Sequence, residues 1–500
     1  MQNTLEENSG ILLIKSKFFL VRLVSYFSFL LIPILLPKSL ELDQITLIAM
    51  MALYILFMVS QWFLLGKEID HRLKIYFRVN SSIDRVVYRL FMGMTFFIVY
   101  FNLLAFLPSK WIYNSFWITW VGLGLFYSWP TRGKLIKESV TTNFGEFRYL
   151  DRFEKTLVGL VLLLFIFSIP DLPSLTNQDA LKLFFDPLEK FSNQFWNFLT
   201  VNYYPFKKYP RLFKLAWSMH FYVVGLGFFL LTLYALLRFF VSRRLSLLGV
   251  FALLSSWSFS KILASNYGDA ITTTYSLIWV WSLLWVVKSS TYRAGLFLGL
   301  INYWGAVINQ PYSLLIFVQL GLLYGVLLKD KTIWFRKQLI KYSLWGLGLT
   351  LIVLITHLDS FENLQNLNIH FIGNISQILD RKAFFSLSIF GLGILIWKSI
   401  YPEKPLSKNF KFDMERVRDL GLSLLILLLF STVFDSYLVK SFALMWPITV
   451  LSLVPIELLF QTISRLRSSR NMIYLIYILI CLLDSHFEGR VKIFIRLFDS

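Results

Sequence analysis

Long apolar segments constrain this chain more than any other feature. Segments of roughly 17–25 mostly apolar residues recur from one end of the sequence to the other, and each is long enough to cross a bilayer as an α-helix. Hydrophobic residues make up 57% of the chain and charged residues 16%, whereas a soluble domain is typically about one quarter charged. The sequence therefore predicts an all-α, polytopic transmembrane helical bundle with about 13–15 spans.

The ends of the apolar runs give approximate bounds for the expected spans. These are residues 17–36, 44–65, 88–108, 112–128, 155–170, 218–240, 246–262, 270–287, 294–308, 312–328, 342–357, 383–399, 420–434, 441–461 and 471–485. A basic segment, Thr131–Lys155, separates the first four spans from the rest. We therefore expect an N-terminal four-span unit over residues 1–130, a membrane core over 131–400 and C-terminal membrane helices over 401–500.

The formal net charge of the chain is +20, and its basic residues are placed in a pattern that indicates the membrane topology. Basic residues fill the short loop after every even-numbered span, as at Lys67, Arg132, Arg243 and Arg336, and such loops face the cytoplasm. The N-terminus is then cytoplasmic, and the long loops 170–217 and 358–382 are external. The C-terminal tail conflicts with this scheme, because it is basic yet falls outside. No basic domain lies outside the predicted membrane region, which argues against nucleic-acid binding.

Several kinds of site are excluded. The single cysteine, Cys481, allows no internal disulfide and no paired-cysteine metal site. The sequence has no Walker A motif, no G-x-S-x-G, no H-E-x-x-H and no DDxxD-type aspartate pair. The first apolar run has no A-x-A-like cleavage site, so we expect no removed signal peptide. The absence of large domains fits a multi-pass protein of a bacterial inner membrane.

The external loop 170–217 is the longest polar interruption between two apolar segments. It contains Asp171, Asp179, Asp186 and Glu189, and apolar residues at helical spacing between Asp179 and Tyr204. This pattern indicates amphipathic helices in the membrane interface, and carboxylates there suit an enzyme acting on lipid-linked substrates. The alternative is a solvated loop with an interfacial aromatic belt.

From the fifth span onward, the layout resembles the GT-C superfamily of membrane glycosyltransferases, which includes protein mannosyltransferases and aminoarabinose transferases. The resemblance covers roughly residues 150–400 and consists of a span ending at Pro170, an aspartate-bearing external loop, six spans with short loops and a second external loop. It implies that an aspartate of the first external loop is essential. Many members have an Asp-Glu pair there, and the nearest match is Asp179-Ala180.

The resemblance implies transfer of a sugar from a polyprenyl-phosphate donor to a lipid or glycan acceptor on the external face. Such a reaction needs a carboxylate to deprotonate the acceptor hydroxyl, for which we expect Asp171 or Asp179. A divalent cation, Mg²⁺ or Mn²⁺, would offset the leaving phosphate, with Asp179 and Asp186 as possible ligands. Basic residues at the end of the loop are expected to hold phosphate: Lys207, Lys208 and Arg211. Turn, helix-terminal and snorkelling roles are the alternatives for these residues.

Further candidates lie near other external span ends. Asp269 is expected as a second carboxylate and Tyr267 as a substrate contact, the alternative for Asp269 being a helix cap. Asn309 and Gln310 are expected to bind sugar hydroxyls, or else form a turn. His220 is a candidate substrate residue, with an interfacial role as the alternative.

On the cytoplasmic side, the mixed-charge stretch Gly145–Glu154 is expected to be a solvated loop, with a partner or lipid headgroups as alternative ligands. Two other functions compete with the glycosyltransferase. A transporter or flippase of lipid-linked glycans would place ionisable residues inside its spans. A non-catalytic membrane scaffold would tolerate replacement of the external aspartates. The oligomeric state has no signature in the sequence.

Overall fold

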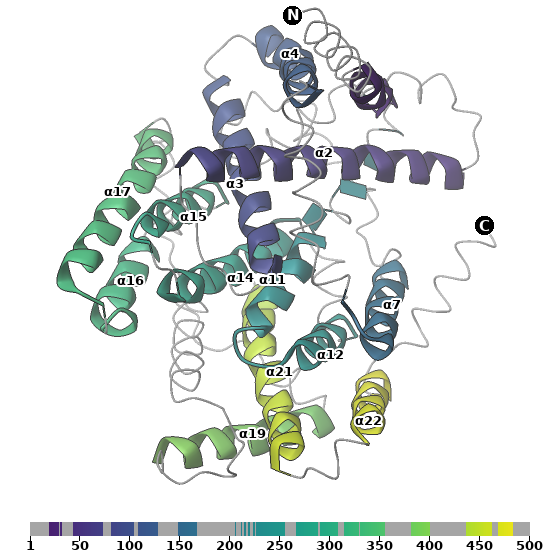
Figure 1. Ribbon diagram of the computed structural model, residues 1–500, viewed down its shortest axis with the longest axis vertical. Coiled ribbons are helices and arrows are strands. Elements are labelled where there is room, and N and C mark those ends of the chain that lie inside the picture. Colours follow the sequence, from purple (N-terminus) through teal and green to yellow (C-terminus); the bar gives the residue numbers. More distant parts are fainter. Residues whose placement is uncertain are drawn as a thin grey trace, which may run out of the picture. The chain divides into compact units, whose positions relative to one another are not determined.

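Helices, joined by short turns, make up most of the described backbone. The computed structural model describes residues 20–29, 31–32, 44–73, 82–104, 109–128, 149–167, 206, 212, 215–216, 219–220, 224–225, 227–255, 267–288, 291–308, 315–329, 331–355, 382–400, 437–462 and 469–483. All regular secondary structure in these residues is helical (Figure 1), which confirms the predicted all-α class. The chain divides into two compact units, Met1–Arg148 with Leu175–Leu226 and Tyr149–Ser174 with Gly227–Ser500.

The first unit contains the long helix α2 (Gln44–Leu73), α3 (Ser82–Leu104) and α4 (Ser109–Ser128). α2 and α3 cross each other (Figure 1) with glycine on both sides of the crossing. A Cβ atom on Gly66 would lie 1.8 Å from the carbonyl oxygen of Arg89, and one on Gly93 would lie 1.8 Å from that of Trp62. Only glycine therefore allows the two backbones to approach this closely.

Tyr26 anchors the preceding short helix, Leu20–Phe29, to this unit. Its ring packs edge-on against Phe57 of α2, with 4.9 Å between centroids. Its hydroxyl donates a hydrogen bond of 2.9 Å to the backbone carbonyl of Trp120 in α4. The phenol thus buries its ring and satisfies its polar end, as buried tyrosines usually do.

The second unit contains a run of helices joined by short connections. Its members are α7 (Arg152–Phe167), α11 (Gly227–Leu237), α12 (Arg243–Leu254), α14 (Tyr267–Lys288), α15 (Ala294–Ile308), α16 (Leu315–Leu322), the π-helical segment η7 (Leu323–Leu327), α17 (Ile333–Ile355), α19 (Lys382–Ile400), α21 (Tyr437–Thr462) and α22 (Arg470–Leu483).

Helices α15 and α17 run parallel and are in close contact (Figure 1). Near their starts Tyr292 packs against Trp334, with 5.3 Å between ring centroids. Further along, a Cβ on Gly299 would lie 2.4 Å from the carbonyl oxygen of Ser343, and one on Gly346 would lie 2.6 Å from that of Leu296. Because α16 and η7 lie between the two in sequence, the chain must reverse direction twice to align them.

Positive charge collects where α15 and α17 begin. Arg336 donates hydrogen bonds to the backbone carbonyls of Lys329 at 2.9 Å, Lys331 at 3.1 Å and Tyr324 at 3.2 Å. These bonds satisfy carbonyl groups at the end of η7, where cations are favoured. Lys288 and Arg293 flank the neighbouring α14–α15 turn. We call this end of α14–α17 the basic end.

Helices α19 and α21 meet at a glycine and a proline. Pro455 has no backbone N–H, so the carbonyl of Leu451, four residues earlier, has no intrahelical donor. Gly391 of α19 packs against this carbonyl, because a Cβ there would lie 1.9 Å from the Leu451 oxygen. Ser388, one turn earlier in α19, donates 2.9 Å to the carbonyl of Ile448.

Most expected spans overlap described helices, and α15 matches its expected range of 294–308. α17 begins at Ile333 rather than at residue 342, because its first turns carry Arg336, Lys337 and Lys341, which lower hydropathy without opposing helix formation. Of the described residues, one helical stretch, Thr46–Leu73, meets the length and composition needed to cross a membrane; other apolar stretches are 10–17 residues long. The expected span 420–434 lies outside the described residues.

Candidate functional site

Most of the residues expected at the external face lie outside the described part of the chain. These are Asp171, Asp179, Asp186, Lys207, Lys208, Arg211, Asn309 and Gln310. The described candidates are Tyr267, Asp269 and His220. Tyr267 and Asp269 form the first turn of α14 in the second unit, whereas His220 belongs to the first unit.

The backbone places the first turn of α14 and the end of α15 toward the same end of the second unit. A short turn joins Lys288 to Ala294, and Phe297 of α15 packs against Trp285 and Trp281 of α14, with 4.9 Å and 5.9 Å between ring centroids. α15 therefore runs back along α14, and Ile308 ends it away from the basic end. Asn309 and Gln310 follow directly in the sequence.

His220 is buried in the first unit, with 4% of its surface exposed. Its ring packs edge-on against Trp62 of α2, with 6.0 Å between centroids. The imidazole is enclosed by the protein, and the interfacial alternative stays a prediction. A role in substrate binding stays a prediction.

A buried polar trio links α14, α15 and α16. Asn302 Nδ2 donates 2.8 Å to the carbonyl of Leu298 and 2.7 Å to Oε1 of Gln319. Gln319 Nε2 in turn donates 3.4 Å to the hydroxyl of Ser282. All three side chains are fully buried. Sequence reasoning missed the trio, although single amides inside apolar runs were the available signal.

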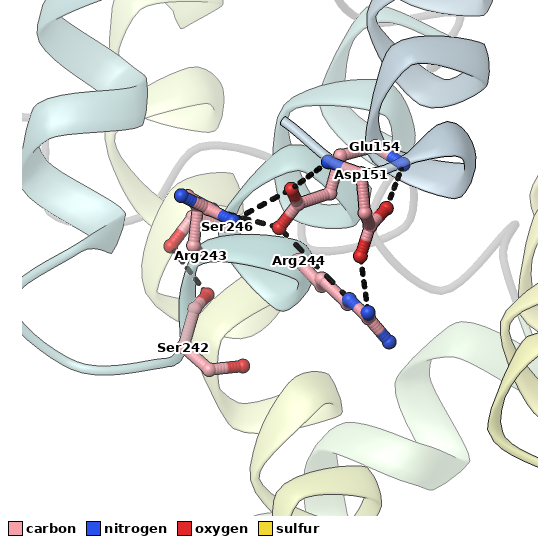
Figure 2. Close-up of polar contacts among 6 residues, drawn as sticks. All are labelled: Asp151, Glu154, Ser242, Arg243, Arg244 and Ser246. Atoms are coloured by element: carbon pink, nitrogen blue, oxygen red, sulfur yellow. Dashed lines mark hydrogen bonds and ion pairs between the residues drawn. The ribbon is translucent and has the colours of Figure 1, made fainter. Parts of the chain in front are cut away.

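Ion pairs join the start of α7 to the start of α12 (Figure 2). Asp151 Oδ1 accepts 2.7 Å from the backbone N–H of Glu154, and Glu154 Oε2 accepts 3.0 Å from that of Asp151. This reciprocal capping box satisfies two N–H groups at the α7 terminus. The same two hydrogen bonds hold the carboxylates of Asp151 and Glu154 close together at the start of α7.

Two arginines of α12 bind these carboxylates. Arg243 donates from Nε and Nη2 to the two carboxylate oxygens of Glu154, at 2.7 Å each. Arg244 donates to Asp151, and its Nε lies 3.9 Å from Glu154 Oε1. The side chain of Glu154 is only 2% exposed, so its charge is neutralised inside the protein. Glu154 is therefore not the solvated loop residue that we expected, whereas Asp151 precedes the helix and its side chain is 36% exposed.

The charges in this cluster shift pKa values in opposite directions. Partial burial acts to raise the pKa of Asp151, but the backbone hydrogen bond from Glu154 and the Arg244 guanidinium outweigh it, so the pKa is lowered. The hydrogen bonds to Glu154 outweigh burial at Arg243 and raise its pKa. Both groups are held in their charged forms.

Helices α21 and α22 complete this region. Glu457 of α21 accepts a hydrogen bond of 3.3 Å from the backbone N–H of Ser242, which precedes α12. Tyr474 of α22 packs against Phe153, with 5.2 Å between ring centroids. Helices α7 and α12 thus meet α21 and α22, which lie much later in the sequence, at one charged cluster.

Within the described residues, no three histidine, cysteine or acidic side chains lie close enough together to hold a metal ion. In comparisons with protein-family models, with curated proteins and with solved structures, no match to this chain is found.

Proposed function

We propose that this chain is a multi-pass membrane protein, consistent with a bacterial inner membrane, with the basic end of α14–α17 facing the cytoplasm. Large apolar side chains are exposed on several helices, including Phe317 at 65%, Phe390 at 63% and Met472 at 67%. Apolar surface on this scale is typical of contact with lipid. Glycine at the α2–α3, α15–α17 and α19–α21 contacts is also typical of helices packed in a bilayer.

We propose further that the chain is a membrane glycosyltransferase that moves a sugar from a polyprenyl-phosphate donor to a lipid or glycan acceptor. The observation that carries this proposal is the position of Asp269 and Tyr267 in the first turn of α14, toward the end of the unit opposite the basic end. In the proposed membrane placement, this end of α14 would lie where a lipid-linked phosphate is accessible. In the sequence, Asp171 comes four positions after Phe167, the last residue of α7.

In this proposal Asp171 or Asp179 deprotonates the acceptor hydroxyl, and Asp269 is the second carboxylate. Lys207, Lys208 and Arg211 bind the donor phosphate, and Asn309 and Gln310 bind sugar hydroxyls. A divalent cation held by Asp179 and Asp186 would supply charge stabilisation of the leaving phosphate.

The test is a transfer assay in membranes with radiolabelled polyprenyl-phosphate sugars at matched expression. Asp171→Asn, Asp179→Asn and Asp269→Asn are compared with Asp330→Asn, which lies between Lys329 and Lys331 at the basic end. We expect loss of transfer by about 10²-fold or more in at least one external variant, with Asp330→Asn retaining activity. Equal activity in all four variants contradicts the proposal.

A transporter or flippase of lipid-linked glycans is the second candidate. In the first unit, the buried side chains of Asp70 and Arg89 form an ion pair at 3.5 Å near the α2–α3 crossing. Buried ionisable groups in membrane helices commonly mark transport pathways. Reconstituted liposomes with fluorescent lipid-linked glycans distinguish the two functions, because flipping without sugar transfer supports the transporter alone.

A further inference from the structure

We propose that one face of the first half of α17 binds the headgroup of an anionic phospholipid in the cytoplasmic leaflet. This face carries Trp334, Lys337, Lys341 and Trp345, and we call it the lysine–tryptophan face. The inference rests on the proposed membrane placement of the basic end and is independent of sugar transfer.

The four residues share one side of the helix because they are spaced three or four positions apart. Trp334 and Trp345 are 60% and 67% exposed, and the two lysines between them are exposed as well. The opposite side of α17 packs against α15 and carries buried residues: Leu339, Ser343 and Gly346. The lysine–tryptophan face therefore points away from α15.

The charge of this face is complementary to an anion. Neither α15 nor α17 contains an acidic residue, and the sequence from Lys288 to Lys341 has seven basic residues and one acidic residue, Asp330. Lys337 and Lys341 are four positions apart, and like charges at this spacing destabilise a helix. An anion held between the two ammonium groups would remove their repulsion.

The two tryptophans indicate a lipid headgroup rather than a soluble anion. Tryptophan is enriched at the membrane interface, where its ring contacts acyl chains while its N–H group reaches water. The Nζ atom of Lys341 lies 6.0 Å from the centroid of the Trp345 ring, so a cation and an aromatic ring are held together on this face. A free phosphate ion would contact the lysines alone, whereas a phospholipid would contact the lysines and the tryptophans.

The test is a lipid titration of the purified full-length chain in detergent, read out by native mass spectrometry. The probe is phosphatidylglycerol, and phosphatidylcholine with the same acyl chains is the zwitterionic comparison. Lys337→Gln and Lys341→Gln are measured singly and combined. We expect about fivefold weaker binding of the first phosphatidylglycerol for each lysine removed, because each basic residue near an anionic surface adds a similar attraction.

The matched control combines Arg152→Gln with Lys155→Gln. It also removes two exposed positive charges, from the first turn of α7, a helix that contains no tryptophan. We expect the control to bind phosphatidylglycerol as wild type does. Lys337→Arg combined with Lys341→Arg keeps the charge of the face and should keep the affinity within about twofold.

Three results would overturn the proposal: equal affinity of wild type for the two lipids, unchanged affinity in the combined Lys337→Gln and Lys341→Gln variant, or an equal loss in the α7 control. Displacement of phosphatidylglycerol by inorganic phosphate at the same concentration overturns the assignment to a phospholipid in favour of free phosphate.

Flotation of the reconstituted chain with phosphatidylcholine vesicles separates this inference from the membrane placement. Failure to float contradicts the placement and the lipid site together. Flotation without a preference for phosphatidylglycerol in the titration contradicts the lipid site alone. Neither measurement involves sugar transfer, so an inactive wild type in the transfer assay contradicts only the enzyme.

Discussion

Arg243 and Glu154, which are 89 positions apart in sequence, form a bidentate ion pair with both N–O distances at 2.7 Å. The pair connects the start of α12 to the start of α7, and the glutamate is almost fully buried. Stability of the second unit should therefore depend on this contact more than on an exposed ion pair, which contributes about 0–1 kcal/mol.

Arg243→Ala should lower the free energy of unfolding by about 2 kcal/mol, because it leaves a buried carboxylate with reduced compensation. Arg244, whose Nε lies 3.9 Å from Glu154 Oε1, limits the loss. Thermal unfolding of the purified chain in detergent measures the change. Arg293→Ala is the control, and an equal loss in both variants would show that the ion pair contributes nothing specific.

Asp151 should make stability depend on pH in the acidic range. Its pKa is lower in the folded chain than in the unfolded chain, so its contribution is fully present above about pH 4 and is lost as pH falls through the folded pKa. Melting temperature measured from pH 7 to pH 3 should therefore fall less steeply below pH 4 in Asp151→Asn than in wild type. Parallel curves would contradict the assignment.

Gly299→Ala should destabilise the chain by about 1–3 kcal/mol, because the new methyl group would lie 2.4 Å from the Ser343 carbonyl oxygen and force α15 and α17 apart. Gly348→Ala is the matched control on α17, since a Cβ there meets no atom within 4 Å. It should leave stability unchanged or raise it by up to about 1 kcal/mol through helix propensity. Melting temperatures of the two variants, measured together, distinguish packing from propensity.

Gln319→Leu should cost about 1 kcal/mol by removing the hydrogen bonds to Asn302 and Ser282. A double-mutant cycle with Asn302→Ala isolates the shared contact. The two changes should be less than additive, because each removes the same 2.7 Å bond. Full additivity would mean that the amides do not interact in solution.

Sequence reasoning predicted helices well where polar residues mark both ends of an apolar run. α15 is such a case, with Arg293 before it and Asn309 after it. The start of α17 was placed nine residues late, because hydropathy treats Arg336 and Lys341 as loop residues although both favour helix. Whether a segment is helical can thus be predicted from its own residues. The position of the helix end cannot be predicted from hydropathy, because charged residues occur both in helices and in loops.

The contacts within the candidate sites could not be predicted from the sequence, for a different reason. Arg243, Arg244 and Glu154 were interpreted as topology signals or loop residues, since nothing in their spacing indicates a partner 89 positions away. Asn302 and Gln319 each stand alone in an apolar run and show no periodicity. Of the expected external residues, Asp269 and Tyr267 are placed at a helix start, and their roles stay predictions.

Pro455 interrupts the backbone hydrogen bonding of α21 near the end of the helix. Because the carbonyl of Leu451 has no intrahelical donor, α21 has one backbone hydrogen bond fewer at Pro455 and resists bending less there than elsewhere. The segment after Pro455 carries Glu457, whose contact with the Ser242 N–H spans 3.3 Å. A bend at Pro455 would therefore move Glu457, which accepts the hydrogen bond from the residue that precedes α12.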